Sequence, residues 1–578
     1  MTGGFVTGGT PAMMIDNIRS KIEGSRRGES AKALGAFYTD AQVAEFLVWW
    51  GIRTGRDTVM DPSFGGGVFL RSACQRLLQL GGEPAAQVFG VEIEPETYTR
   101  ITEELSDELG VKKRNLWQTD FFELNSIPAR QVDVVVGNPP FIRYQRFAGE
   151  ARKLALACAA SQGVKLNELA SSWAPFLIHS IAMVKPGGRL AMVVPMEITQ
   201  AAYALPVLEH LSKSFGTVTF LTFKEKLFPD LNEEALLLLA ESKGECDARF
   251  YWRGLGHAGL LAPMQQTGRR SFFGCRPVNA QAISQRREKL IEHFIPQKAR
   301  DLYRELKNLP LTHHLGELAD VGIGYVTGAN DFFHLDPKAI ETWGIPQAFL
   351  KPAVRRGRAL AGLRFTQEDW HKALKTGEAS YLLRIKNGEA LPKSVRNYLE
   401  HGEAQGVSQT YKCRTRSPWF CVPHVHQPDA FLTYMSGMAS RLVTNNAGAV
   451  APNSLHILRL HPHVSLTMPA ITALWQTSLT RLSAEIEGHA LGGGMLKLEP
   501  TEAENVVIAS SQRHNGRLVE LAEELNALAR NSDEATMQIR ADAVVLQDGL
   551  GLSQKDCGLL RKAADSLRQR RYSRGTTA

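Results

Sequence analysis

Residues 58–80 read TVMDPSFGGGVFLRSACQRLLQL and have the pattern of a β-strand, a tight turn and an α-helix. A short apolar run, TVMDP, leads into a turn with glycine at positions 65, 66 and 67. The residues that follow place apolar side chains at helical spacing. A strand that passes through a glycine-rich turn into a helix is the first part of a β-α-β unit.

The same alternation of apolar runs and helix-like stretches continues to about residue 245. It predicts parallel strands with helices on both faces of the sheet, which is the doubly wound, Rossmann-like α/β class. Ligands of this class bind outside the carboxyl ends of the strands. The further apolar runs lie at 87–95, 132–140, 189–195 and 217–223.

The chain has 578 residues, too many for a single hydrophobic core. We predict an N-terminal helical extension over 1–34 and the doubly wound domain over 35–245. A second domain over 246–578 is predicted to be mixed α+β, because its apolar runs are short and irregular. Its segment 269–304 is basic and helix-like, and residues 513–571 return to a helical pattern.

The two halves of the chain differ in charge. Residues 1–250 contain 26 Lys and Arg against 29 Asp and Glu, a net charge of −3. Residues 251–578 contain 41 against 30, a net charge of +11. A basic half favours a polyanionic partner, although a solvated basic surface would give the same totals.

Composition excludes several classes of protein. Hydrophobic residues make up 44% and charged residues 22%, values that exclude a mainly disordered or fibrous chain. We expect no membrane span, because no stretch approaches 18 uninterrupted apolar residues. The seven cysteines are scattered and odd in number, which favours a reducing cytoplasm over a disulfide framework.

One group of metal-capable residues occurs in the second half, at Cys413, Cys421, His424 and His426. Its spacing is not a common zinc spacing, so ordinary packing is the preferred interpretation and no metal is expected.

Two features of the first half suggest a nucleoside cofactor. The turn that begins at Asp61 and Pro62 and contains Gly65 and Gly67 would let a nucleotide approach the backbone closely. Glu92 ends the next apolar run, where an acid can accept hydrogen bonds from ribose hydroxyls. Alternatively, the glycines serve a tight turn and Glu92 is an exposed residue at a strand end.

The residues Asn138-Pro139-Pro140-Phe141 follow the strand-like run VDVVVG. They could form a plain turn, because Asn and Pro are turn formers. Two prolines and an exposed aromatic make a costly plain turn, however. In the functional interpretation, the Asn138 side-chain oxygen and the Pro139 carbonyl accept hydrogen bonds from an exocyclic amine and direct its lone pair at an electrophile. Phe141 would stack on the base.

Together these residues resemble the class I methyltransferases that use S-adenosylmethionine, and within them the adenine-N6 DNA methyltransferases of the gamma group. Residues 35–40, GAFYTD, resemble the motif that closes over the methionine part of the cofactor. The turn at 61–67 resembles the motif usually written DPACGSGxF, from which Ser63, Phe64 and Gly66 depart. Residues 138–141 resemble the NPPF motif of the family.

The resemblance implies a role for each matching residue. Glu92 would bind the ribose, Asp120 would contact the adenine of the cofactor, and Phe228 would stack on the other face of the target base. The implied catalytic residues are Asn138, Pro139, Pro140, Phe141 and Phe228. The implied cofactor-binding residues are Phe37, Tyr38, Thr39, Asp61, Pro62, Gly65, Gly67, Glu92, Asp120, Phe121 and Asn138.

The implied activity is site-specific methyl transfer from S-adenosylmethionine to N6 of a flipped-out adenine in double-stranded DNA, within a restriction-modification or related defence system. A separate restriction endonuclease or the subunits of a defence complex are further candidate partners. Methylation of cytosine N4, RNA or a protein glutamine, and an inactive DNA-binding subunit, are the alternatives. No metal is required by this chemistry.

A basic region over 351–416 is the predicted DNA-binding surface, with 14 Lys and Arg against 6 Asp and Glu. Such side chains can neutralise phosphates and read guanine edges. Three phrases at 322–333, 349–358 and 491–500 resemble the target-recognition region of large gamma-group enzymes, although the first could be a glycine hairpin and the third a loop. Tyr381, Tyr398, Tyr411 and Trp419 lie among or beside the proposed DNA contacts, which are Lys351, Arg355, Arg356, Arg358, Lys412, Arg414 and Arg416.

Overall fold

A computed structural model describes residues 39–126, 131–142, 146–228, 234–268, 272, 274–510 and 515–572. The expected helical extension over 1–34, and the candidate residues Phe37 and Tyr38, lie outside the described residues. The chain divides into two compact units, one up to His293 and one from Phe294 onward.

The first unit is built on a nine-stranded sheet with the order β3-β2-β1-β4-β5-β7-β6-β8-β9. The strands from β3 to β5 run parallel to their neighbours, as predicted. Beyond β5 the sheet is mixed, because β7 runs antiparallel to both β5 and β6, which the sequence pattern did not reveal. The strands are β1 (Val59–Asp61), β2 (Val88–Glu92), β3 (Leu116–Gln118), β4 (Val132–Gly137), β5 (Val184–Pro195), β6 (Phe215–Phe223), β7 (Ala235–Lys243), β8 (Arg249–Leu255) and β9 (Arg276–Val278).

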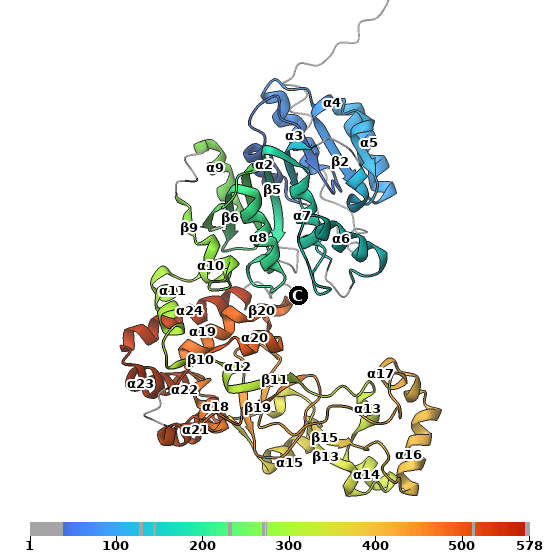
Figure 1. The fold of residues 1–578 in the computed structure, drawn as a ribbon, viewed down its shortest axis with the longest axis vertical. Coiled ribbons are helices and arrows are strands. Elements are labelled where there is room, and N and C mark those ends of the chain that lie inside the picture. The colour runs from blue at the N-terminus through green and yellow to red at the C-terminus, as the bar shows by residue number, and fades with distance from the viewer. Residues whose placement is uncertain are drawn as a thin grey trace, which may run out of the picture. The chain divides into compact units, whose positions relative to one another are not determined.

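Helices pack against this sheet in two groups. Helix α2 contacts α3 and packs on β4 and β5, whereas α7 contacts α8 and packs on β5. Helices α7 and α8 lie in front of the sheet in Figure 1. The strands β1 and β2 are buried along their whole length, which explains why they are apolar up to the acid that ends each of them, Asp61 and Glu92. The main helices are α2 (Ala41–Gly51), α3 (Val68–Gln79), α5 (Pro95–Leu109), α6 (Gly149–Ser161), α7 (Trp173–Ala182), α8 (Ala204–Ser214) and α9 (Leu261–Thr267).

The first unit extends beyond the predicted boundary at residue 245. Strand β8 pairs in parallel with β6 along its full length, and β9 pairs with β8, so both belong to the first sheet. The segment 269–304, expected as one basic helix, contains instead β9, the short helix α10 (Ala280–Ser284) and the beginning of α11 (Gln297–Lys307) among its described residues.

The second unit is mixed α+β with a helical C-terminal part, as predicted. Its largest sheet has five strands in the order β11-β19-β16-β18-β14, and three smaller sheets accompany it. These strands are β10 (Thr312–His314), β11 (Ala319–Ile323), β12 (His334–Leu335), β13 (Leu350–Val354), β14 (Arg364–Phe365), β15 (Ala379–Leu383), β16 (Ala430–Thr433), β17 (Met435–Ser436), β18 (Leu442–Asn445), β19 (Leu455–Leu460), β20 (His489–Ala490), β21 (Leu496–Lys497) and β22 (Val507–Ala509).

The helices of the second unit gather at its two ends. Figure 1 shows α13, α14, α16 and α17 at one end of this unit and α18 to α24 at the other. The first group comprises α13 (Asn330–Phe333), α14 (Pro337–Trp343), α16 (Lys393–Ala404) and α17 (Tyr411–Arg414). The longer members of the second group are α18 (Met468–Leu474), α19 (Ser478–Glu487), α21 (Asn515–Arg530), α22 (Glu534–Ala541) and α24 (Gln554–Tyr572). Between the groups, α15 (Gln367–Lys375) packs on β15.

The last helix, α24, is bonded to the rest of the second unit through a buried arginine. The Arg571 guanidinium forms two hydrogen bonds with the Glu485 carboxylate, at 2.9 and 3.0 Å, and donates to the carbonyls of Gly437, Met438 and Gly494. Gly494 lies in the 491–500 phrase, so this stretch is anchored to the helical part of the unit. Among the described residues, no helix is long and apolar enough to cross a membrane.

Candidate active site

Three chain segments that carry predicted site residues meet at one edge of the first sheet. Strand β1 lies between β2 and β4 and runs parallel to both. Asp61 ends β1, Glu92 ends β2, and Asn138 follows the last residue of β4. Because the carboxyl ends of parallel strands share an edge, the glycine turn, Glu92 and residues 138–141 belong to one site.

The glycine turn is held by Glu92. One oxygen of its carboxylate accepts a hydrogen bond from the Gly65 amide at 2.8 Å, and the other accepts from the Glu94 amide at 2.9 Å. Glu92 is buried, which rules out the interpretation of an exposed residue at a strand end. A carboxylate has about four lone-pair positions, so Glu92 retains acceptor capacity for hydroxyl groups of a ribose. Gly67 has a φ of +76°, and a Cβ there would lie 2.8 Å from Ile101.

Asp61 is completely buried, and one of its oxygens has no protein partner. Its Oδ1 accepts a hydrogen bond from the Ser63 amide at 3.1 Å, whereas Oδ2 has no hydrogen-bond partner among the described residues. Burial raises the pKa of Asp61 to about 8, and the nearby negative charge of Glu92 contributes to the rise. A positively charged ligand would favour the ionised form of this buried carboxyl, so the position fits a ligand that carries positive charge.

The Asn138 side chain is oriented by Thr39. The Nδ2 group of Asn138 donates a hydrogen bond to Oγ1 of Thr39 at 3.1 Å. The side-chain oxygen, Oδ1, is buried and has no partner among the described residues. The Oδ1 atom of Asn138 is thus a hydrogen-bond acceptor, close to the glycine turn, that no described protein group uses.

Sequence reasoning missed Ser172, which holds the loop after β4 in place. Its hydroxyl donates to the carbonyl of Pro140 and accepts from the amide of Ile142 at 2.8 Å. The Ser172 amide in turn donates to the Ile142 carbonyl at 3.0 Å. These bonds fix the backbone on both sides of Phe141. A serine just before a helix is a common capping residue, so its sequence position gave no sign of this role.

The helix that follows Ser172 is braced at the carboxyl end of β5. The indole of Trp173 donates to Oε2 of Glu197 and contacts the hydroxyl of Tyr203, both at 3.0 Å. Tyr203 also donates to Glu197, and burial raises the pKa of its phenol. This network positions α7, and through it the loop that Ser172 holds.

The candidate aromatic residues are more enclosed than expected. Phe141, expected as an exposed ring, is 7% exposed, and Phe228 is also 7% exposed. Phe121 packs against Phe176 and His179 with ring centroids 4.7 and 4.5 Å apart, so its described contacts are those of a core residue. Asp120 is half-buried, and burial raises its pKa while its Oδ1 accepts from the Phe122 amide.

Most of the predicted DNA contacts in the second unit are exposed. Lys351, Arg356, Arg358, Lys412 and Arg414 are exposed, and Arg355 forms an ion pair with Asp331 at 3.3 Å. Arg416 differs from the expectation, because its guanidinium donates to the backbone carbonyls of Val326 and Thr327. It therefore holds the loop of the 322–333 phrase, and burial lowers its pKa.

Several aromatic residues of the basic region, and Cys413 among the metal-capable residues, belong to the core, whereas His424 and His426 are exposed. Tyr398 stacks on Phe332 with centroids 4.6 Å apart, and Trp419 packs on the same ring. The partly buried Tyr381 packs against Trp370. Cys413 is completely buried and donates to the Thr327 carbonyl, in line with the packing interpretation. No group of three or more His, Cys, Asp or Glu in the described part of the chain is arranged to hold a metal.

Two family matches cover most of the chain. Residues 26–204 match the family described as N-6 DNA Methylase, and residues 287–546 match the C-terminal domain of the Type II methyltransferase M.Eco57I. Type II methyltransferase M.AccI of Acinetobacter calcoaceticus is 20% identical over 480 residues, which are 82% of this chain and 85% of the relative. Type II methyltransferase M.XamI of Xanthomonas campestris pv. amaranthicola is 23% identical over 501 residues, 84% and 86% of the two chains.

Two solved structures share the fold. A DrdV–DNA complex gives a TM-score of 0.50 at 11% identity, covering 90% of this chain and 59% of that one. The ATP-dependent Type ISP restriction-modification enzyme LlaBIII bound to DNA gives a TM-score of 0.53 at 9% identity, covering 92% and 44%. The chain thus spans about half the length of these two solved proteins.

The raised pKa of Asp61 predicts a pH-dependent stability. Between its ordinary pKa of 3.8 and about 8, Asp61 holds a proton in the folded protein and loses it on unfolding. Folding is therefore opposed increasingly as pH rises through this window, by up to ~1.4 kcal/mol per pH unit. Urea unfolding at pH 5, 6, 7 and 8 should show a flatter pH dependence for Asp61→Asn than for the wild type. Asp107→Asn, at an exposed position of α5, is the control, and identical slopes for wild type and Asp61→Asn would contradict the assignment.

Proposed function

We propose that this chain, a site-specific N6-adenine DNA methyltransferase of the restriction-modification type, takes its methyl group from S-adenosylmethionine and acts on an adenine flipped out of duplex DNA. The enzyme class rests on the match to N-6 DNA Methylase over 26–204 and on the Type II methyltransferase relatives. The order of the motifs, with the glycine turn before residues 138–141 and the second unit last, supports assignment to the gamma group.

The unpaired Oδ1 of Asn138 carries the mechanistic proposal. An exocyclic amine on adenine is a poor nucleophile, because its lone pair is delocalised into the ring. In the proposed complex, Asn138 Oδ1 and the Pro139 carbonyl accept the two N–H groups of this amine and turn its lone pair toward the methyl donor. Ser172 and Thr39 keep these acceptors in place, so the residues act by orientation.

The residues around the glycine turn fit the cofactor. Glu92 has free acceptor positions for ribose hydroxyls. The positive charge of the amino acid part would favour the ionised form of Asp61, whose buried Oδ2 could then accept a hydrogen bond from it. When bound, S-adenosylmethionine supplies an electrophilic methyl group on its sulfonium. Pro62, Gly65, Gly67, Asp120, Phe121 and the GAFYTD residues Phe37, Tyr38 and Thr39 are retained as proposed cofactor contacts. Pro140, Phe141 and Phe228 complete the proposed pocket for the target base.

We assign the grip on double-stranded DNA to the second unit. Its exposed basic side chains at Lys351, Arg356, Arg358, Lys412 and Arg414 can neutralise phosphates, with Arg355 beside them. A separate restriction endonuclease or the subunits of a defence complex are the proposed protein partners. The cytoplasm is the proposed compartment, supported by cysteines that are odd in number and scattered along the sequence.

The activity is tested with purified protein, labelled S-adenosylmethionine and duplex DNA. We expect N6-methyladenine in the digested product, identified by nucleoside mass spectrometry. Asn138→Ala should abolish transfer, because the amine loses its oriented acceptor, while cofactor affinity measured by calorimetry stays close to that of the wild type. Methylation of cytosine, or a loss of cofactor affinity as large as the loss of rate, would overturn the assigned role.

Ser172→Ala tests whether the loop after β4 must be held in position. We expect kcat to fall by roughly 10- to 100-fold, because misplaced acceptors no longer align the amine. Affinity for the cofactor should remain, and Ser172→Thr, which retains the hydroxyl, should recover part of the rate. Ser180→Ala on the same helix is the control, since its hydroxyl bonds to the Phe176 carbonyl within the helix. An equal loss of rate in both alanine variants would indicate a general effect on folding.

The double variant Arg356→Glu/Arg358→Glu tests the basic surface. If both side chains contact phosphates, the slope of log Kobs against log salt concentration should become less steep by about 0.9 for each contact. Fluorescence anisotropy with a labelled duplex at several salt concentrations measures this slope. Lys555→Glu/Lys562→Glu, at two exposed positions on α24, is the control with the same change of net charge, and an unchanged slope in the Arg356→Glu/Arg358→Glu variant would rule out these contacts.

A further inference from the structure

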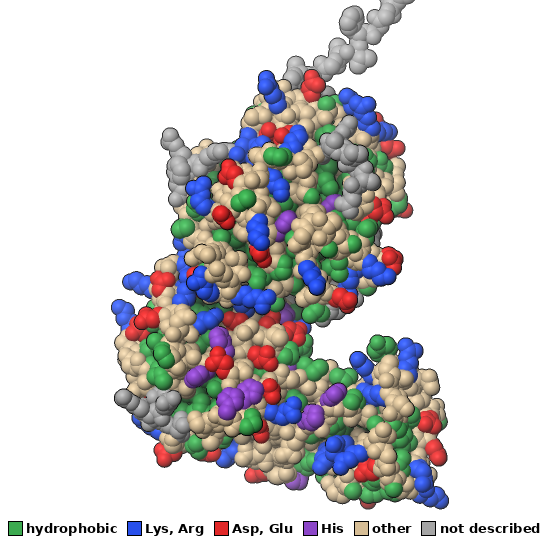
Figure 2. All heavy atoms as spheres, viewed as in Figure 1, with side chains coloured by type: hydrophobic (Ala, Val, Ile, Leu, Met, Phe, Trp, Pro, Cys, Tyr) green, Lys and Arg blue, Asp and Glu red, His purple; other side chains and the backbone are tan. Residues whose placement is uncertain are grey.

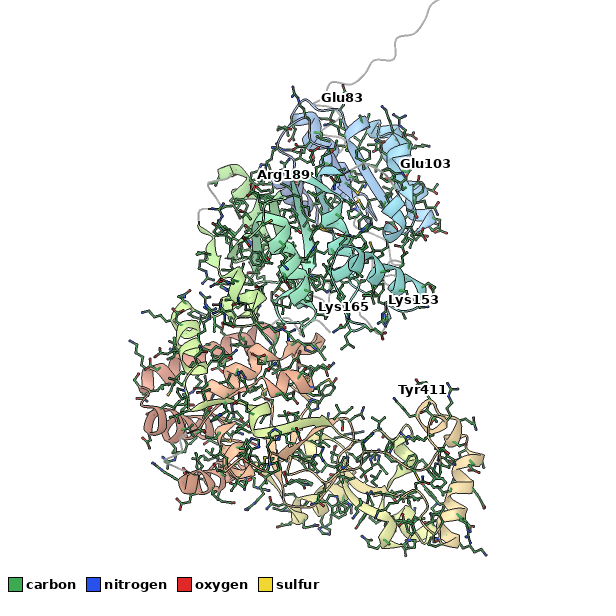
Figure 3. The ribbon with its side chains drawn as sticks, viewed as in Figure 1. Glu83, Glu103, Lys153, Lys165, Arg189 and Tyr411 are labelled. Carbon is green, nitrogen blue, oxygen red and sulfur yellow. The ribbon has the colours of Figure 1, made fainter. Side chains whose placement is uncertain are left out.

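Tyr411 differs from the other aromatic residues of the basic region. Its side chain is 66% exposed, whereas the neighbouring Tyr398 is 6% exposed and belongs to the core. Among the described residues, Tyr411 is the aromatic residue that remains largely open to solvent. Figure 3 shows its side chain projecting from α17 at the end of the second unit.

The short helix that carries Tyr411 is a rigid support. Cys413, on the opposite side of α17, is completely buried and bonds to the Thr327 carbonyl. Arg416 donates to the carbonyls of Val326 and Thr327, which ties the end of α17 to the same loop. A Cβ on Gly328 would lie 2.6 Å from Cβ of Lys412, so glycine is needed for the loop to approach the helix this closely. Solvent exposure of Tyr411 is therefore a property of a fixed helix.

Two cations accompany the exposed ring. The Lys412 ammonium and the Arg414 guanidinium each lie 5.5 Å from the centroid of Tyr411, within cation–π range. Both side chains are exposed. Figure 2 shows hydrophobic and basic side chains next to one another at this end of the unit. A flat exposed ring beside two cations matches the chemistry of nucleic acid, which offers base faces for stacking and phosphates for the cations.

We propose that Tyr411 is a DNA-contacting residue that stacks on a base, while Lys412 and Arg414 hold the adjacent phosphates. This inference rests on the proposed function, because it takes duplex DNA as the partner of the second unit. Exposing such a ring has no benefit for the fold, since the apolar area stays in water. A base that is unstacked from its neighbours can cover the ring. The bonds of Cys413 and Arg416 to the carbonyls of Val326 and Thr327 hold the helix that carries the ring.

Salt dependence separates the stacking residue from the phosphate contacts. Stacking releases no counterions, so Tyr411→Ala should weaken DNA binding by about tenfold and leave the slope of log Kobs against log salt unchanged. Lys412→Gln and Arg414→Gln should each reduce the slope by about 0.9. Tyr411→Phe retains the ring and should bind as the wild type does. Ile539→Ala, an exposed apolar position on α22 of the same unit, is the control.

The outcomes are measured by fluorescence anisotropy on the full chain, after wild-type methyl transfer to the same duplex has been established. Wild-type affinity in Tyr411→Ala, or a loss shared equally by Tyr411→Phe, would overturn the stacking role. A changed salt slope in Tyr411→Ala would assign the residue to positioning the cations instead. If the wild-type chain methylates no DNA, the proposed function fails first, and this result is distinct from any effect at Tyr411.

Discussion

The site depends on the close packing of β1 against β4 at their carboxyl ends. A Cβ at Gly137 would lie 2.9 Å from Oδ1 of Asp61 and 3.3 Å from Cδ of Pro62, so the last residue of β4 must lack a side chain. This absence lets the two loops begin side by side. The carboxylate of Asp61 and the amide of Asn138 can then belong to one site, although 77 positions separate them in the sequence.

The same edge concentrates acceptors that the described protein groups leave unpaired. Oδ2 of Asp61 and Oδ1 of Asn138 are both buried without a hydrogen-bond partner in the described part of the chain. Each such atom opposes folding, typically by ~1–3 kcal/mol, unless a ligand supplies the missing donor. The donors of a cofactor and of an adenine amine would offset this cost. Stability and ligand binding are thus coupled at this edge. Asp61 is protonated at neutral pH in the absence of a ligand, so a donor or a positive charge placed at Oδ2 would act by displacing this proton.

The sequence predicted those parts of the fold and site that depend on local pattern. Apolar runs revealed the parallel strands, and the glycine turn, Glu92 and Asn138 follow directly from strand ends. Three features could not be predicted from the sequence, because they depend on tertiary contacts. Strand β7 inserts antiparallel between β5 and β6, β8 extends the sheet past residue 245, and Ser172 bonds to Pro140, which lies 32 positions earlier in the chain. In the second unit, the clustering of basic residues in the sequence did not show which side chains are exposed. Arg356 is exposed, whereas the Arg416 guanidinium donates to backbone carbonyls.

The burial of Phe141 restricts how a base can reach the proposed pocket. The ring is 7% exposed, so stacking on its face requires surface that this conformation does not offer. The backbone on both sides is held, because Ser172 bonds to Pro140 and to Ile142. Movement of the loop would break these bonds, whereas rotation of the side chain between staggered rotamers would preserve them. Under the proposed mechanism, the acceptors at Asn138 and Pro139 therefore stay in place while the Phe141 ring turns to admit the base.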